Sequence, residues 1–287
     1  MSGLSFLSHA LGYIHSVSER TLNTLATRST SHWANKVPAV TLIFWVIKVM
    51  STTVGETAAD YLNVDLHFGL IGTSVCTGVL LAIALALQIR AKRYIPSLYW
   101  AAVVLISVFG TLVTDNLSDN FGVPLAVSTG AFSAVLIATF AVWYFKEKTL
   151  SIHSINTVKR EFFYWTAILF TFALGTAAGD WIAEGLRLGY PKATLLFGTL
   201  IAVVALARYA FKANAVACFW IVFILTRPFG ASCGDLLSQP IVNGGLGLGT
   251  AGISALFLVI ITSLVIYLSV SRNNGIIGKL NKDQTHG

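Results

Sequence analysis

Four segments of this chain repeat one pattern: an aromatic residue, a tryptophan, nine residues, a glycine, four residues and an aspartate. The tryptophan, glycine and aspartate of the four copies are Trp45, Gly55 and Asp60; Trp100, Gly110 and Asp115; Trp165, Gly175 and Asp180; and Trp220, Gly230 and Asp235. The aspartates are 55, 65 and 55 residues apart, which indicates that one unit was duplicated and the pair then duplicated again. A period of this length means that one structural unit recurs along the chain.

Each unit contains two apolar runs, and a helix needs about 20 such residues to cross a bilayer. The eight runs cover residues 38–60, 68–90, 97–118, 123–145, 162–184, 191–211, 214–237 and 248–270. Charged residues make up 11% of the chain, against about 25% in a soluble domain. Alternating strand patterns are absent, which leaves helices as the structure that satisfies backbone groups in lipid. We therefore predict an all-α polytopic membrane protein with eight transmembrane helices.

The four two-helix units should share one orientation, because each crosses the membrane twice. Parallel units are related by an axis along the membrane normal. We therefore expect a pseudo-fourfold bundle with repeats at about 38–90, 97–145, 162–211 and 214–270. The charges within the membrane all lie in the first span of a unit. The first spans are therefore expected near the axis, and the second spans toward lipid.

Basic residues give the orientation of the chain. Of the 19 lysines and arginines, 15 lie before the first unit, where one unit ends and the next begins, or after the last unit. The positive-inside rule then places both termini in the cytoplasm and the tryptophans in the aromatic belt on that side. The net charge of +7 is explained by this bias and by anionic lipid, so we expect no nucleic-acid partner.

The membrane domain is expected to cover residues 37–270. Before it, residues 1–36 form a cytoplasmic N-terminal segment, either an amphipathic helix on the inner membrane surface or a loosely ordered tail. After it, residues 271–287 are expected to form a disordered cytoplasmic tail.

The repeated pattern resembles a family of bacterial integral-membrane proteins built from four copies of a two-helix repeat of unknown function. The segments that carry the resemblance are NKVPAVTLIFWVIKVMSTTVGETAAD, QIRAKRYIPSLYWA, FYWTAILFTFALGTAAGD and ILTRPFGASCGDLLSQPIVNGGLGLG. The resemblance covers about residues 36–270 and implies eight spans, in a bacterial inner membrane. It implies little about chemistry. The second repeat departs from the family pattern, since TLVTDNLSD adds Asn116 and Asp119 beyond the repeat aspartate.

Ionisable groups within a membrane point to function unless a structural partner explains them. We expect a ring of carboxylates around the axis, open to the outside, whose metal-ligand candidates are Glu56, Asp60, Asp115, Asp180 and Asp235. Secondary polar candidates are Thr52, Thr53, Asp119 and Glu184, with Thr111 and Thr176 beneath the ring. Hard oxygen ligands of this kind suit Mg²⁺, Mn²⁺ or Ca²⁺. Alternatively, each repeat aspartate caps the outer end of its helix.

Two cations in the first spans break the repeat symmetry. Lys48 is a candidate gate charge, and Arg227 is a candidate counter-ion to the carboxylates. Lys48 and Glu56 are eight residues apart on one helix face and could instead pair with each other. Pro228 follows Arg227, and we expect it to break that helix, as in the discontinuous segments that line transport sites.

The leading functional hypothesis is an inner-membrane transporter or exporter of a small divalent cation, Mn²⁺ or Mg²⁺, with no other cofactor. One alternative is a non-transporting scaffold or sensor, which predicts that every buried charge is paired and that the bundle core has no cavity. Another is an intramembrane enzyme acting on a lipid or quinone, which predicts an opening to lipid beside Glu56. The lipid bilayer is the expected partner, and a homodimer is optional because four repeats can complete a bundle.

Overall fold

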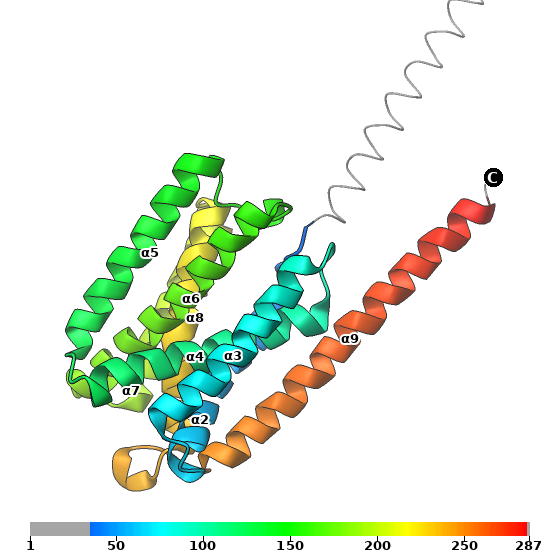
Figure 1. The fold of residues 1–287 in the computed structure, drawn as a ribbon. Helices are drawn as coiled ribbons and strands as arrows, with labels where there is room; N and C mark the ends of the chain where they lie inside the picture. The colour runs from blue at the N-terminus through cyan, green and yellow to red at the C-terminus, as the bar shows by residue number, and fades with distance from the viewer. Residues whose placement is uncertain (1–34, 286–287) are drawn as a thin grey trace, which may run out of the picture.

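The computed structural model describes the backbone of residues 35–285 and the side chains of residues 35–272. Within that range the chain contains helices and no strand, and eight helices are long and apolar enough to cross a membrane. They are α2 (Leu42–Asp60), α3 (Gly69–Arg90), α4 (Pro96–Asp115), α5 (Leu125–Glu147), α6 (Val158–Asp180), α7 (Tyr190–Ala210), α8 (Ala215–Ser238) and α9 (Thr250–Thr285) (Figure 1). The predicted all-α class with eight spanning helices is confirmed.

The helices that carry the repeated motif form the inner ring of the bundle. Helix α2 packs against α4 and α8, and α6 packs against the same two helices. Between 50% and 61% of the residues in the apolar stretches of these inner helices are buried, against 11–22% in α3, α5, α7 and α9. The pseudo-fourfold arrangement and the inner position of the first spans therefore agree with the prediction.

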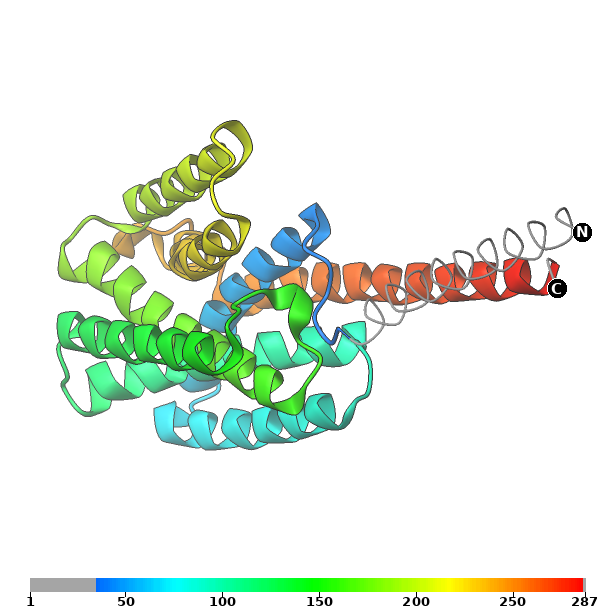
Figure 2. The same cartoon turned by 90° about the horizontal axis from the view of Figure 1, so that it is seen from above.

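Each outer helix packs mainly on the inner helix of the following repeat. Helix α3 packs on α4, α5 on α6 and α7 on α8, while α9 returns to pack on α2 and so closes the ring (Figure 2). The repeats therefore interlock, and none of them buries its apolar surface without the next. The amphipathic segment predicted for residues 1–36 lies outside the described residues, except for its last two.

The repeat glycines set the close approach of neighbouring inner helices. A Cβ atom on Gly55 would overlap Ser107, one on Gly110 would crowd Phe172, one on Gly175 would overlap Arg227 and one on Gly230 would overlap Thr52. In each case the partner lies three residues before the glycine of the adjacent helix. Small residues allow such approach within a membrane, so one contact repeated four times builds the ring.

The backbone changes immediately after the repeat aspartates. Helices α2, α4 and α6 each pass into one turn of π-helix, namely η1 (Tyr61–Asp65), η2 (Asn116–Asn120) and η4 (Trp181–Gly185). Turns of this type are frequent at functional sites. In the fourth repeat α8 ends at Ser238 instead, ahead of Pro240. The expected break at Pro228 is wrong, because α8 runs through that residue without interruption.

Aromatic side chains fill the inner ring at the end of the bundle where most of the lysines and arginines lie, which we call the basic end. The tyrosine hydroxyls of Tyr99 and Tyr164 are hydrogen bonded at 2.5 Å, and the rings of Phe44 and Phe219 lie 6.1 Å apart. Three of the four motif tryptophans are at most 5% exposed; they are Trp100, Trp165 and Trp220. These three belong to the core rather than to the interfacial belt predicted for them, because the ring buries them against neighbouring inner helices.

The C-terminal helix is longer than expected. Helix α9 continues to Thr285 and projects beyond the other helices (Figure 2). The segment from residue 271, for which the sequence predicted a disordered tail, continues α9 as far as Thr285.

Candidate metal centre

The repeat arranges the residues around the axis in layers, because equivalent positions of the four inner helices lie at equal depth. One layer, one residue after each repeat glycine, comprises Glu56, Thr111, Thr176 and Ala231. The layer beneath it, toward the basic end, comprises Thr52, Ser107, Phe172 and Arg227, and the next comprises Lys48, Val103, Ile168 and Phe223. All twelve residues are buried, so the bundle encloses a polar centre.

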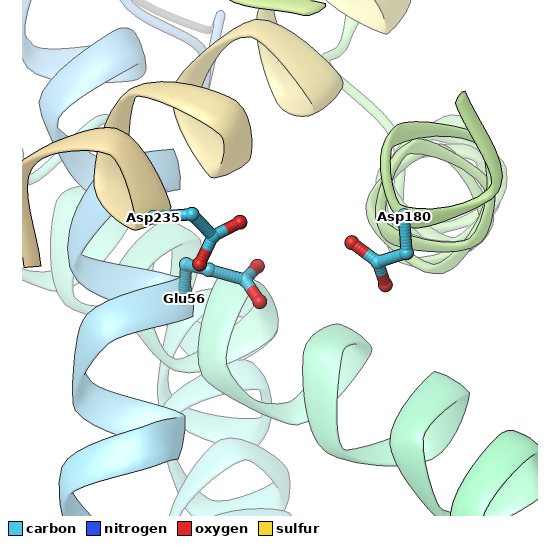
Figure 3. Close-up of side chains that lie close together, drawn as sticks. All are labelled: Glu56, Asp180 and Asp235. Atoms are coloured by element: carbon cyan, nitrogen blue, oxygen red, sulfur yellow. The ribbon is translucent and has the colours of Figure 1, made fainter. Parts of the chain in front are cut away.

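Three carboxylates converge at the acidic end of this centre. Glu56 comes from the C-terminal part of α2, Asp180 from the end of α6 and Asp235 from α8, and each offers an oxygen within 4.8 Å of the others. Figure 3 shows Glu56 and Asp235 side by side, with Asp180 facing them from the opposite side. Glu56 and Asp235 are buried, and Asp180 is half-buried. Hard divalent cations take carboxylate oxygens of this kind as ligands, so we regard the three as a candidate metal site.

The other predicted ligands lie outside this cluster. Asp60 is half-buried and accepts a hydrogen bond from Gln239 Nε2 at 3.2 Å, and Asp115 is also half-buried. Asp119 and Glu184 are exposed, and they accept hydrogen bonds from Ser118 at 2.8 Å and Tyr190 at 2.9 Å, respectively. The four repeat aspartates therefore share a position in the motif but do not form one equal ring.

The hydroxyls of Thr52 and Thr53 stabilise helix contacts. Thr52 donates to the carbonyls of Val49 at 2.6 Å and Thr226 at 3.2 Å, and Thr53 donates to the carbonyl of Gly230 at 3.0 Å. Because these hydroxyls are committed to backbone groups of α2 and α8, they join the two helices rather than face a ligand.

Arg227 reaches across the axis from α8. Its Nη2 donates to Glu56 Oε2 at 3.0 Å, to Thr176 Oγ1 at 2.6 Å and to Thr111 Oγ1. The guanidinium thus binds all three polar members of the next layer, and its side chain has no exposed surface. Gly175 makes this possible, since a Cβ atom there would overlap the Arg227 side chain. Arg227 is therefore the counter-ion of Glu56, as the sequence suggested.

Lys48 lies one layer deeper, and no acidic residue of the described range 35–272 forms an ion pair with it. Its Nζ is 4.2 Å from the ring centroid of Phe172 and 4.3 Å from that of Phe223, and the residue is 0% exposed. No residue of the described range 35–272 forms a hydrogen bond with this nitrogen. The open alternative of a Lys48–Glu56 pair is therefore wrong. Cation–π contacts provide about 2 kcal/mol when desolvated, well short of the cost of burying an unpaired charge.

Charge is strongly divided between the two ends of the bundle. Of the ten acidic residues in the range 35–272, eight belong to the end that holds the carboxylate cluster: Glu56, Asp60, Asp65, Asp115, Asp119, Asp180, Glu184 and Asp235. That end has only Arg187 and Lys192 as loop cations. A concentration of one sign of charge at one end of a protein attracts ions of the opposite sign.

Sequence reasoning missed the aromatic contacts of the two buried cations. Phe172 occupies the repeat position of Arg227, and Phe223 occupies that of Lys48. Phe172 also lies 5.8 Å from the guanidinium carbon of Arg227, so one ring contacts both cations. An alignment of the four repeats places each phenylalanine at the position that another repeat fills with Arg227 or Lys48. The alignment does not show that the rings contact these cations.

Comparison with known proteins agrees with the repeat structure. No curated protein and no solved structure matches the chain. The model of one family, described as Repeat of Unknown Function (DUF347), matches four times, at residues 43–94, 98–149, 163–214 and 218–274. The four matches follow the four interlocking units of the bundle and cover most of its length. The chain therefore belongs to the DUF347 repeat family.

Proposed function

We propose that this protein transports a small divalent cation, Mn²⁺ or Mg²⁺, across a bacterial inner membrane, with both termini in the cytoplasm. The observation that carries the proposal is the convergence of Glu56, Asp180 and Asp235 from three inner helices onto one point, with oxygens within 4.8 Å of one another. A structural cap would need one carboxylate at each helix end, whereas three carboxylates gathered against mutual repulsion fit a cation that binds between them.

The cation enters from the acidic end. The acidic residues there raise the local concentration of cations, and Asp180 is accessible enough to meet an arriving ion. The opposite end is closed by the aromatic pairs Tyr99–Tyr164 and Phe44–Phe219. Passage therefore requires alternating access rather than an open pore, as in transporters whose repeats move against one another around a central site.

Arg227 acts as a tethered cation that neutralises Glu56 until a metal ion arrives. Its Nη2 donates a hydrogen bond to Glu56 Oε2 at 3.0 Å, so an arriving metal ion and the guanidinium compete for the same carboxylate. When the ion binds Glu56, Arg227 is released toward the Phe172 ring. This exchange avoids leaving the buried Glu56 charge unpaired in either state.

Lys48 supplies a second barrier on the path toward the basic end. In its ammonium form Lys48 repels a cation that moves down the axis, so the ion leaves the site in that direction only after Lys48 has been displaced from Phe172 and Phe223. The unpaired Lys48 also favours transport over a passive scaffold, since a scaffold predicts that every buried charge is paired.

The test is uptake of ⁵⁴Mn²⁺ by proteoliposomes that contain the purified full-length protein. Mg²⁺, Ca²⁺ and Zn²⁺ serve as competitors, and a pH gradient is imposed in each direction. We expect flux in the wild type and loss of flux in Glu56→Gln. The matched control is Asp65→Asn, which removes one acidic charge from an exposed residue at the same end and should retain flux.

Absence of flux for every ion under both gradients would overturn the transport proposal. Equal loss in Glu56→Gln and Asp65→Asn would show that general surface charge, rather than the axial cluster, drives uptake.

A further inference from the structure

A lateral cavity lies at the basic end, far from the carboxylate cluster. It has a volume of about 360 Å³ and lies where the segment before α2 meets α4 and α9. The wall is largely apolar and includes Phe44, Trp100 and Leu268, while Tyr94 and Arg272 lie at the polar part of the lining. An apolar cavity with a cationic group at one side fits an amphiphile rather than a free inorganic ion.

Among the residues whose side chains are described, 35–272, the cations beside this cavity have no acidic partner. The guanidinium of Arg272 lies over the Tyr94 ring, with 5.5 Å between Cζ and the ring centroid, and the exposed Arg93 directly precedes Tyr94 in the chain. Within residues 35–272 the basic end has two acidic side chains, Glu147 and Glu161. Both are engaged elsewhere in ion pairs of 2.6–2.9 Å. An arginine guanidinium in the cavity lining suits a phosphate or carboxylate group as its ligand.

We propose that this cavity binds the headgroup of an anionic phospholipid from the surrounding leaflet. The phosphate lies against Arg272 and Arg93, and the first part of the acyl chains lies along Leu268 and Phe44 between α9 and α2. Basic pockets between membrane helices take anionic headgroups in this way. Because α9 closes the ring by packing on α2, such a lipid would join the last helix to the first two repeats.

The test uses the full-length protein in bilayers that contain a photoactivatable phosphatidylglycerol or a phosphatidylcholine with the same acyl chains. Labelled peptides are mapped by mass spectrometry, and labelling on the exposed face of α5 provides the internal reference. We expect phosphatidylglycerol to label the α9 and α4 peptides that line the cavity, in excess over phosphatidylcholine. Glycerol phosphate added in solution supplies the soluble form of the headgroup.

Two variants and one matched control address the site. Arg272→Gln should reduce the labelling by about fivefold, the effect of one basic residue at an anionic surface. Leu268→Trp should also reduce it, because it fills the cavity and keeps every charge. Lys92→Gln removes an exposed charge beside Arg93 and should leave the labelling unchanged.

Equal labelling by the two lipids, or an equal loss in Lys92→Gln and Arg272→Gln, would overturn the proposal. Displacement of the lipid by glycerol phosphate would also overturn it, in favour of a soluble anion. None of these measurements depends on cation flux.

Discussion

The buried contact between Arg227 and Glu56 makes the sharpest prediction. Arg227→Met keeps a side chain of similar length but removes the guanidinium. Glu56, which is 6% exposed, is then left within 4.8 Å of the Asp180 and Asp235 oxygens without a cation. Breaking a buried pair by removing one partner costs about 3–5 kcal/mol. We therefore expect Arg227→Met to lower the free energy of unfolding by that amount.

The reciprocal change should cost less. In Glu56→Gln the amide oxygen still accepts from Arg227, and the guanidinium keeps Thr111, Thr176 and the carbonyl of Thr52, 3.4 Å from Nη1. Loss of a charged hydrogen-bond partner alone costs about 1.5–3 kcal/mol. The two threonine hydroxyls retain bonds to the carbonyls of Ser107 and Phe172 at 3.2 Å, so few groups become unsatisfied.

The double variant removes both charges at once and leaves neither uncompensated. Its cost should fall short of the sum of the single costs, with a coupling energy of about 2–3 kcal/mol. The assay is equilibrium unfolding of the purified protein in mixed micelles, followed by tryptophan fluorescence. Costs that add to within about 0.5 kcal/mol would refute the reasoning that the pair is one electrostatic unit.

Further predictions concern the same centre. Mn²⁺ should raise the unfolding midpoint more in Arg227→Met than in the wild type, because the metal no longer competes with the guanidinium and ligand binding stabilises the folded state; an equal shift would contradict the competition. Gly175→Ala should destabilise the protein and abolish flux, since the added Cβ overlaps Arg227, whereas Gly72→Ala meets no atom within 4 Å and should be neutral in both assays. Lys48→Met should leave the free energy of unfolding equal or higher, since an unpaired buried polar group is removed, yet change the rate of flux; a fall of several kcal/mol in that free energy would show that Lys48 has a stabilising partner.

The arrangement of the helices could be predicted because the repeat is visible in the sequence. The apolar runs give eight spans, and the glycine of each motif gives one contact that recurs four times. The connection of each outer helix to the next repeat could not be predicted. The motif tells which helices are equivalent, but a short loop allows the second span to pack on either neighbour, and the packing of α9 on α2 depends on the whole ring.

The candidate site was predicted only in part. Glu56 and Arg227 were singled out because they break the repeat symmetry, and the structure pairs them. Lys48 was singled out on the same ground, but its phenylalanine partners come from other helices. Asp119 and Glu184, the acidic secondary candidates, lie in the π-helical turns that follow the repeat aspartates and are exposed.

By itself the sequence determined the class of the protein, the number of its spans, the equivalence of its repeats and the residues that depart from that equivalence. These properties follow from local physics, since the lipid environment requires helices and a repeated spacing requires a repeated depth. Only the tertiary structure decided which of the four equivalent repeat aspartates lie next to Glu56, and which cation pairs with Glu56. That selection depends on distances between helices, and those distances are fixed by side-chain packing around the whole ring.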